Sequence, residues 1–204
     1  MEKGIKIEVT AVEWDEELAR LYQERFPNDK VIVADAHQYL LDHYKEFDFI
    51  WSSPPCPTHS RVRMSQKNTD SFIPMYPDMK LYEEILFLQH FFEGEWIVGN
   101  VVPYYEPLVK PTEQVGRHLF WSSYSFKADD VKRPPGFINM ANVAGKNALM
   151  DWLGAYYEEN IYYAGNHCPA QVLRNCVHPD LGLQIFEQSG AATRRRSLIE
   201  EPSF

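Results

Sequence analysis

The sequence contains few cysteines, and their spacing matches neither a disulfide framework nor a zinc site. Its 204 residues include three cysteines, at positions 56, 168 and 176, and no C-x-x-C pair occurs. An odd number without close pairing excludes a disulfide framework and gives no support to a thiolate zinc site. The thiols are therefore expected to be free, in a reducing, cytoplasmic environment.

Long apolar runs and an excess of basic residues are also lacking. No apolar stretch is long enough to span a bilayer, and the polar N-terminus has no apolar signal-peptide core, so no membrane partner is expected. The 20 Lys and Arg residues against 29 Asp and Glu residues give a net charge of −9. This balance argues against a protein that grips nucleic acid over its entire surface, although local basic patches can still contact phosphates.

Apolar material is plentiful and is arranged in alternating strand and helix patterns. Hydrophobic residues make up 45% of the chain, which is enough for one domain with a core. The expected strands are 7–12, 31–33, 47–51 and 96–98, with 118–126 as a candidate for another, and the expected helices are 15–26, 36–44 and 78–92. Strands separated by helices of this length predict an α/β fold with right-handed crossovers and a mostly parallel, doubly wound sheet.

The regular pattern weakens after residue 126. Residues 127–169 are punctuated by Pro and Gly and form a small irregular segment, either a substrate-reading insertion or a surface excursion, with a short helix near 147–153. A packed helix is expected after Pro179. The expected organisation is a core at 1–126, the insertion at 127–169, a helical return to the core at 170–188 and a polar tail at 189–204.

The loop that follows the expected strand 47–51 carries the strongest chemical signal. Residues 53–60 read S-P-P-C-P-T-H-S. Paired prolines remove two backbone donors and fix two φ angles, so the segment continues neither as a central strand nor as a helix. Such a loop would hold the Cys56 thiol at the carboxyl end of a strand, where open α/β sheets keep their active sites. With His59, Arg61 and Arg63 downstream, the pattern favours a nucleophilic thiolate.

Other interpretations of the cysteines stay open at this point. Cys168 and Cys176 are expected to pack as small apolar side chains. Cys56 and His59 together could serve an unrelated thiol enzyme. No ligand spacing supports a metal site at Cys56, His59 and His37, so no metal is expected.

Pro54-Pro55-Cys56 resembles the catalytic loop of the DNA cytosine-5 methyltransferases, and further segments resemble motifs of that family in the family's order. These segments are Val9-Thr10-Ala11-Val12-Glu13, Asp35-Ala36-His37, Gly99-Asn100-Val101, Arg117 and Gln171-Val172-Leu173-Arg174-Asn175-Cys176-Val177. The ordered set runs from about residue 9 to residue 186 and is similar to the short members common in phages.

The resemblance implies a Rossmann-like methyltransferase core that uses S-adenosyl-L-methionine. Catalytic roles fall to Cys56, which would attack C6 of a cytosine flipped out of double-stranded DNA, to Arg117 and to Asn100. The implied cofactor contacts are Glu13, Trp14, Asp35, Ala36, Pro54 and Asn175, with Glu13 at the ribose and Asp35 at the adenine. The implied setting is the cytoplasm of a bacterial or phage-infected cell, with a role in DNA methylation such as restriction-modification.

Two departures from the family pattern bear on activity. The family opens with a strand and a Phe-x-Gly-x-Gly-like turn around the methionine end of the cofactor, but none of the ten glycines here forms a Gly-x-Gly. Gly99 also stands where the family has the Glu that contacts cytosine N3. We therefore expect a truncated or degenerate methyltransferase with low or no activity, or one that needs a second polypeptide for the cofactor loop. The alternative is a non-catalytic DNA- or protein-binding module that keeps the fold.

Overall fold

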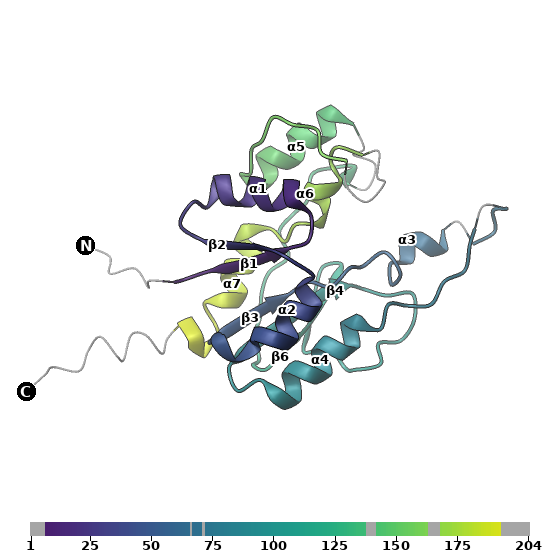
Figure 1. Ribbon diagram of the computed structural model, residues 1–204. Helices are drawn as coiled ribbons and strands as arrows, with labels where there is room; N and C mark the ends of the chain where they lie inside the picture. Colours follow the sequence, from purple (N-terminus) through teal and green to yellow (C-terminus); the bar gives the residue numbers. More distant parts are fainter. Residues whose placement is uncertain (1–6, 66, 71, 138–141, 163–167, 193–204) are drawn as a thin grey trace, which may run out of the picture. The chain divides into compact units, whose positions relative to one another are not determined.

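The computed structural model describes residues 7–65, 67–70, 72–137, 142–162 and 168–192, and the chain divides into two compact units (Figure 1). The first unit consists of Met1–Ala36 and Asp130–Gln184, and the second of His37–Asp129 and Ile185–Phe204. The predicted limits of the core and the insertion stay predictions, and most of the predicted polar tail, from residue 193 on, lies outside the described residues.

The first unit opens with a β-α-β crossover. Strand β1 (Thr10–Glu13) runs parallel to β2 (Lys30–Val33), and α1 (Glu16–Arg25) connects them. The Asp15 carboxylate accepts hydrogen bonds from the amides of Glu17 and Leu18, which satisfies two donors at the start of α1. This confirms the predicted cap and helix, whereas the first strand starts three residues later than predicted.

Three helices from the C-terminal half complete this unit or extend from it: α5 (Val143–Leu153), α6 (Gln171–Asn175) and α7 (Pro179–Phe186). Helix α5 ends at Gly154, whose φ of 62° lies in the left-handed region that glycine adopts without strain. Leu149, Leu153 and Leu173 form an apolar cluster with Cys168. This packing agrees with the structural role predicted for Cys168.

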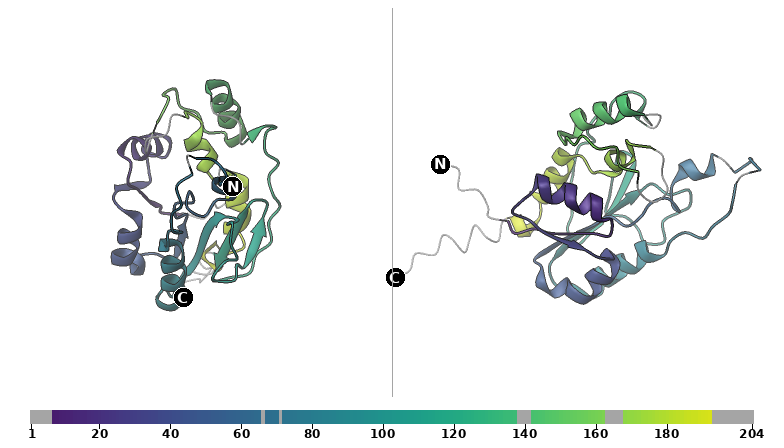
Figure 2. Two further views of the ribbon diagram at one scale, coloured as in Figure 1. Left: turned by 90° about the vertical axis from the view of Figure 1, so that its right-hand side faces the viewer. Right: turned by 45° about the horizontal axis from the view of Figure 1, so that its top comes forward.

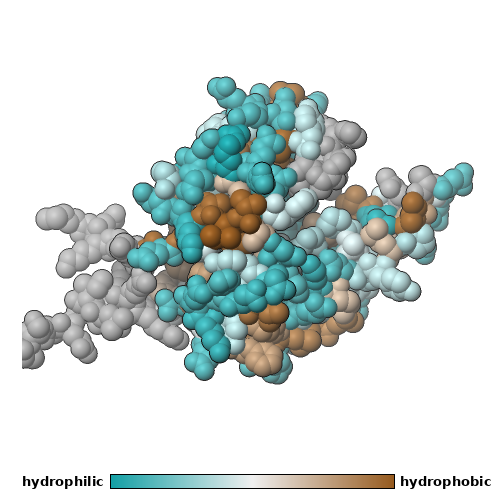
Figure 3. All heavy atoms as spheres, in the orientation of Figure 1, coloured by the Kyte–Doolittle hydropathy of each residue, from teal (hydrophilic) through white to brown (hydrophobic). Residues whose placement is uncertain are grey.

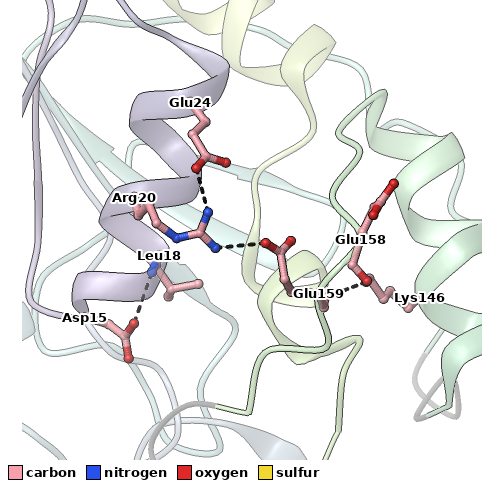
Figure 4. Close-up of polar contacts among 7 residues, drawn as sticks. All are labelled: Asp15, Leu18, Arg20, Glu24, Lys146, Glu158 and Glu159. Atoms are coloured by element: carbon pink, nitrogen blue, oxygen red, sulfur yellow. Dashed lines mark hydrogen bonds and ion pairs between the residues drawn. The ribbon is translucent and has the colours of Figure 1, made fainter.

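Lys146 on α5 ties down the irregular segment that follows it (Figure 4). The Lys146 ammonium is buried and donates to the backbone oxygens of Glu158, at 3.0 Å, and Glu159, at 2.6 Å. The Glu159 carboxylate also pairs with Arg20 of α1, which bonds Glu24 one turn further along. Residues 158–159 are thus bonded to two helices of this unit.

The second unit contains a four-stranded sheet in the order β3-β4-β6-β5. Its elements are α2 (Ala36–His43), the 3₁₀ turn η1 (Tyr44–Glu46), β3 (Phe49–Ser52), α3 (Arg61–Met64), α4 (Lys80–Phe91), β4 (Glu95–Val101), β5 (Glu113–Val115) and β6 (His118–Ser122). Strands β3 and β4 are parallel, and β6 is antiparallel to both β4 and β5. Parallel pairing is therefore present, as predicted, but β6 makes antiparallel pairs on both of its sides, so this sheet is mixed rather than mostly parallel.

Helix α4 covers one face of this sheet (Figure 2). Its buried Leu81, Ile85 and Leu88 pack in one cluster with Trp96 and Val98 of β4 and with the neighbouring strand β6. These positions follow the 3.6-residue period of a helix and the two-residue period of a strand. The packing fixes the carboxyl ends of β3 and β4. The Cys56 loop follows β3 and is bonded to β4 through Asn100.

The segment between α3 and α4 exposes apolar side chains. Ile73, Met75 and Tyr76 are all exposed, and Figure 3 shows hydrophobic spheres among hydrophilic ones on this segment. Within the described part of the chain, no helix has the length and hydrophobicity to cross a membrane.

Candidate active site

The loop that follows β3 carries Cys56 at the start of a tight turn. The Cys56 backbone oxygen accepts hydrogen bonds from the amides of His59, at 3.0 Å, and Ser60, at 3.1 Å. The Ser60 hydroxyl then caps α3 by accepting from Val62. The turn leaves Cys56 half-buried. The paired prolines thus behave as predicted: strand β3 ends at Ser52, and the thiol is presented on a loop of fixed shape.

Arg117 acts electrostatically on the Cys56 thiol. It occupies the turn between β5 and β6, where Gly116 has a φ of 56° and the Arg117 backbone oxygen accepts from Val102 at 2.9 Å. Burial, the larger effect, raises the pKa of Cys56 above its ordinary value, and the positive charge of Arg117 partly offsets this rise. Two residues that are distant in sequence therefore interact electrostatically within the second unit. The raised pKa runs against the predicted thiolate, because the thiol is mostly protonated at neutral pH.

Asn100 supports the loop through a buried hydrogen bond. The side chain is buried on β4, its Nδ2 donates to the Pro54 backbone oxygen at 3.0 Å, and its Oδ1 accepts from the Val101 amide at 2.8 Å. Both ends of the amide are therefore used inside the protein. Asn100 holds the proline segment in place, so this geometry gives it a positioning role.

Phe120 fills the space beside Gly99. A Cβ at residue 99 would lie 3.0 Å from Cε1 and 3.3 Å from Cδ1 of the Phe120 ring, and 3.9 Å from the Ser53 hydroxyl. Phe120 is itself buried on β6. Residue 99 therefore has no carboxylate, and the Phe120 ring occupies the space that a side chain at this position would need.

A buried carboxylate that the sequence interpretation missed lies under the end of β3. Glu84 of α4 accepts a hydrogen bond from the Ser52 hydroxyl, and its Oε1 lies 2.9 Å from His37 Nδ1. It joins α4, the end of β3 and the start of α2. The signal was present, because the spacing from Leu81 and Leu88 places Glu84 on the apolar face of the helix.

The His59 ring bonds a tyrosine. The ring is fully buried, and its Nδ1 lies 2.5 Å from Tyr105 Oη. Burial lowers the pKa of His59, and Asp78 nearby partly offsets this. The neutral form therefore prevails at neutral pH, and the ring is engaged inside the fold.

The predicted cofactor residues, Pro54 excepted, belong to the first unit. Glu13 and Asp35 come at or just after the carboxyl ends of β1 and β2, which are adjacent and parallel, so both lie at the same sheet edge. Trp14, Asp35 and Ala36 are exposed, as is Asn175 at the end of α6. Two carboxylates at one sheet edge and an exposed indole are side chains of the kind that would hold the adenosine half of S-adenosylmethionine, whereas the sequence offers no Gly-x-Gly turn for the methionine half.

Outside this loop, the described residues bear on the predictions for a further cysteine and for a metal site. Cys176 is exposed, so the predicted packing as a small apolar side chain is wrong for this residue, although desolvation raises the pKa of its thiol to about 11. In the described ranges, no cluster of three His, Cys, Asp or Glu side chains is arranged to hold a metal ion.

Comparison with known proteins supports the motif resemblance. Residues 2–78 match the family model for C-5 cytosine-specific DNA methylase, a span that includes β1, β2, β3 and the Cys56 loop. No curated protein sequence matches the chain. Among solved structures, the methyltransferase EhMeth of Entamoeba histolytica aligns at 10% identity and a TM-score of 0.36, over 69% of this chain. The chain matches about half of that structure, 53% of its length. The family match therefore confirms the resemblance over residues 2–78, where the segments at 9–13, 35–37 and 54–56 lie, and the motifs assigned after residue 78 stay predictions.

Proposed function

We propose that this protein transfers the methyl group of S-adenosyl-L-methionine to C5 of cytosine in double-stranded DNA, with Cys56 as the nucleophile. The observation that carries the proposal is the turn that presents Cys56 after β3, together with the electrostatic effect of Arg117 on its thiol. Both residues were assigned to one site from sequence motifs, and the charge of Arg117 acts on the Cys56 thiol. The family match over the Cys56 loop supports the same assignment.

The chemistry requires a covalent bond between protein and base. The Cys56 thiolate attacks C6 of the extruded cytosine, and the electrons of the C5–C6 double bond make C5 nucleophilic. The bound cofactor would supply the methyl group that C5 takes up. Removal of the C5 proton then restores the double bond and expels the thiolate. Arg117 would stabilise negative charge that develops on the base, and Asn100 would keep the loop in place through Pro54.

Two features predict that this reaction is slow or requires a second polypeptide. Gly99 offers no carboxyl group to cytosine N3, and the loss of a positioned general acid costs about 10²- to 10⁴-fold in rate. Among the described residues, Glu13 and Asp35 would hold the ribose and adenine, but no glycine turn encloses the methionine end. We propose that a second polypeptide supplies that turn.

Unpaired strand edges support such a partner. Within the described segments, β1 pairs with β2 alone and β3 with β4 alone. Strand edges of this kind accept a further strand through main-chain hydrogen bonds. Calorimetric titration with S-adenosylhomocysteine tests the idea: the isolated chain should bind weakly or not at all, and tight binding by the pure chain would rule out the need for a partner.

Trapping of the covalent adduct tests the enzymatic proposal. The protein is incubated with duplex DNA that carries 5-fluorocytosine in mixed sequence contexts and with S-adenosylmethionine, and the denatured product is mapped by mass spectrometry. An adduct on Cys56 is expected, absent in Cys56→Ser and retained in Cys176→Ser. A folded protein that forms no adduct in any context would count against catalysis.

A non-catalytic DNA- or protein-binding module is the second candidate. Phe120 beside Gly99 and the raised pKa of Cys56 both favour it, because each works against chemistry at this site. The module predicts that Cys56→Ala binds duplex DNA or a protein partner as well as the wild type does, while the wild type forms no adduct.

A further inference from the structure

We propose that His59 is a positioning residue for Cys56, and that the hydrogen bond between its imidazole and Tyr105 locks the turn that presents the thiol. The inference rests on the proposed role of Cys56 as a nucleophile and assigns His59 a function distinct from that of a base.

The backbone of the turn couples the two residues directly. The His59 amide donates to the Cys56 oxygen at 3.0 Å, and the Ser60 amide donates to the same oxygen at 3.1 Å. Rotation of the Cys56 peptide would break both bonds. The orientation of the thiol therefore depends on where the His59 end of the turn is held.

The segment after β4 holds that end by backbone and side chain together. The Tyr104 amide donates to the His59 oxygen at 3.1 Å, and Ser60 forms a bridge with Pro103. The Tyr105 hydroxyl lies 2.5 Å from Nδ1 of the fully buried His59 ring. This hydrogen bond is costly to break, because the buried His59 Nδ1 would be left without the partner that replaces water.

Two further hydrogen bonds support Tyr105. The Leu108 amide donates to Tyr82 Oη at 3.2 Å, and the Tyr82 hydroxyl donates to Tyr105 Oη at 3.4 Å. The Tyr105 oxygen has a second lone pair, so it can accept from a His59 Nδ1–H or donate its own proton to an unprotonated Nδ1. The lowered pKa of the ring favours the neutral imidazole, which can take either role.

Alkylation of Cys56 by iodoacetamide, resolved by mass spectrometry, tests the proposal on the intact chain without DNA or cofactor. Tyr105→Phe and His59→Leu remove the bond, and His59→Asn keeps an acceptor near the position of Nδ1. Tyr104→Phe is the matched control, since it removes a neighbouring hydroxyl and leaves the Tyr104 amide in place. Rates are followed from about pH 6 to pH 10.

A loosened turn should expose the sulfur and relieve the burial that raises its pKa. Tyr105→Phe and His59→Leu should therefore react about threefold faster or more, with the inflection of the pH profile moved to lower pH. His59→Asn and Tyr104→Phe should resemble the wild type. Equal profiles for all five proteins would overturn the proposal.

Amide hydrogen exchange separates a local effect from unfolding. In Tyr105→Phe, faster exchange is expected in residues 53–60 and unchanged exchange in β4. Equal acceleration in β4 would show a general structural role and would also overturn the proposal. Because thiol reactivity needs neither substrate nor cofactor, failure of the adduct experiment and failure of this one are distinguishable.

Discussion

Phe120 stands directly across from Gly99 in the β4–β6 ladder, and its ring lies 3.0 Å from where a Cβ at residue 99 would be. Contacts this short force either the ring or the backbone to move. The two residues are therefore coupled: the absence of a side chain at 99 permits the aromatic ring at 120. Restoring the carboxylate of the family pattern requires changing both.

Gly99→Glu alone should destabilise the protein by about 1–3 kcal/mol, because it overpacks the core and buries a charge. Combined with Phe120→Leu, the cost should be less than the sum of the two single changes. Urea unfolding of the four proteins in a double-mutant cycle measures the coupling. Strict additivity would show that the ring does not obstruct residue 99. Gly99→Ala serves as the control that adds the Cβ without charge.

Asn100→Ala should lower stability by about 1–3 kcal/mol, because it leaves the Pro54 carbonyl and the Val101 amide without their buried partner. Trapping of Cys56 by fluorinated DNA should fall with it, since the loop loses its support. Gln114→Ala is the matched control: it removes an amide that bonds the Gly116 oxygen on the surface. An Asn100 variant as stable as the Gln114 variant would contradict the positioning role.

Arg117→Met should raise the pKa of the Cys56 thiol further, because it removes the charge that offsets burial. Alkylation of Cys56 at about pH 8 should slow by a factor of roughly 2–5. Arg117→Lys keeps a positive charge and should retain most of the wild-type rate. If Met and Lys variants react alike, the charge of residue 117 does not govern the thiol.

Local patterns predicted much of this fold. Asp15 caps α1, the paired prolines end β3, and the period of Leu81 and Leu88 marks the buried face of α4. Each of these depends on neighbours within a few residues, which a sequence displays directly. Strand β5 was missed because it has three residues, too few for an alternating pattern to be recognised.

The sequence indicated which residues belong to the candidate site, but not which other side chains they contact. The motif order indicated Cys56 and Arg117, whose assignment to one site stays a prediction, and the charge of Arg117 acts on the Cys56 thiol. The crowding of Gly99 by Phe120 and the bond from Tyr105 to His59 depend on strand register and on a loop path, which no local pattern encodes. Contacts between residues far apart in sequence therefore carry most of the new information.

A lower pH should reduce the stability of the wild type more than that of His59→Asn. The folded pKa of His59 lies below its ordinary value of 6.5, so protonation favours the unfolded chain. This contribution to stability is complete above about pH 6.5 and is lost as the pH falls through the folded pKa. Urea midpoints at about pH 7.5 and pH 5 should differ more for the wild type than for the variant. Equal differences would show that another group controls the acid response.

Lys146→Met should destabilise the first unit by about 1–3 kcal/mol, because it strips the Glu158 and Glu159 carbonyls of their donor while it keeps a side chain of similar length. Arg20→Met removes an ion pair with Glu159 on the exposed side of the same segment, where water screens the charges, and should leave stability unchanged. Amide exchange in α5 during urea titration measures both. Burial lowers the pKa of Lys146, and the Glu159 and Glu158 carboxylates partly restore it. A loss in the Arg20 variant as large as that in the Lys146 variant would mean that the surface pair, rather than the buried ammonium, secures residues 158–159.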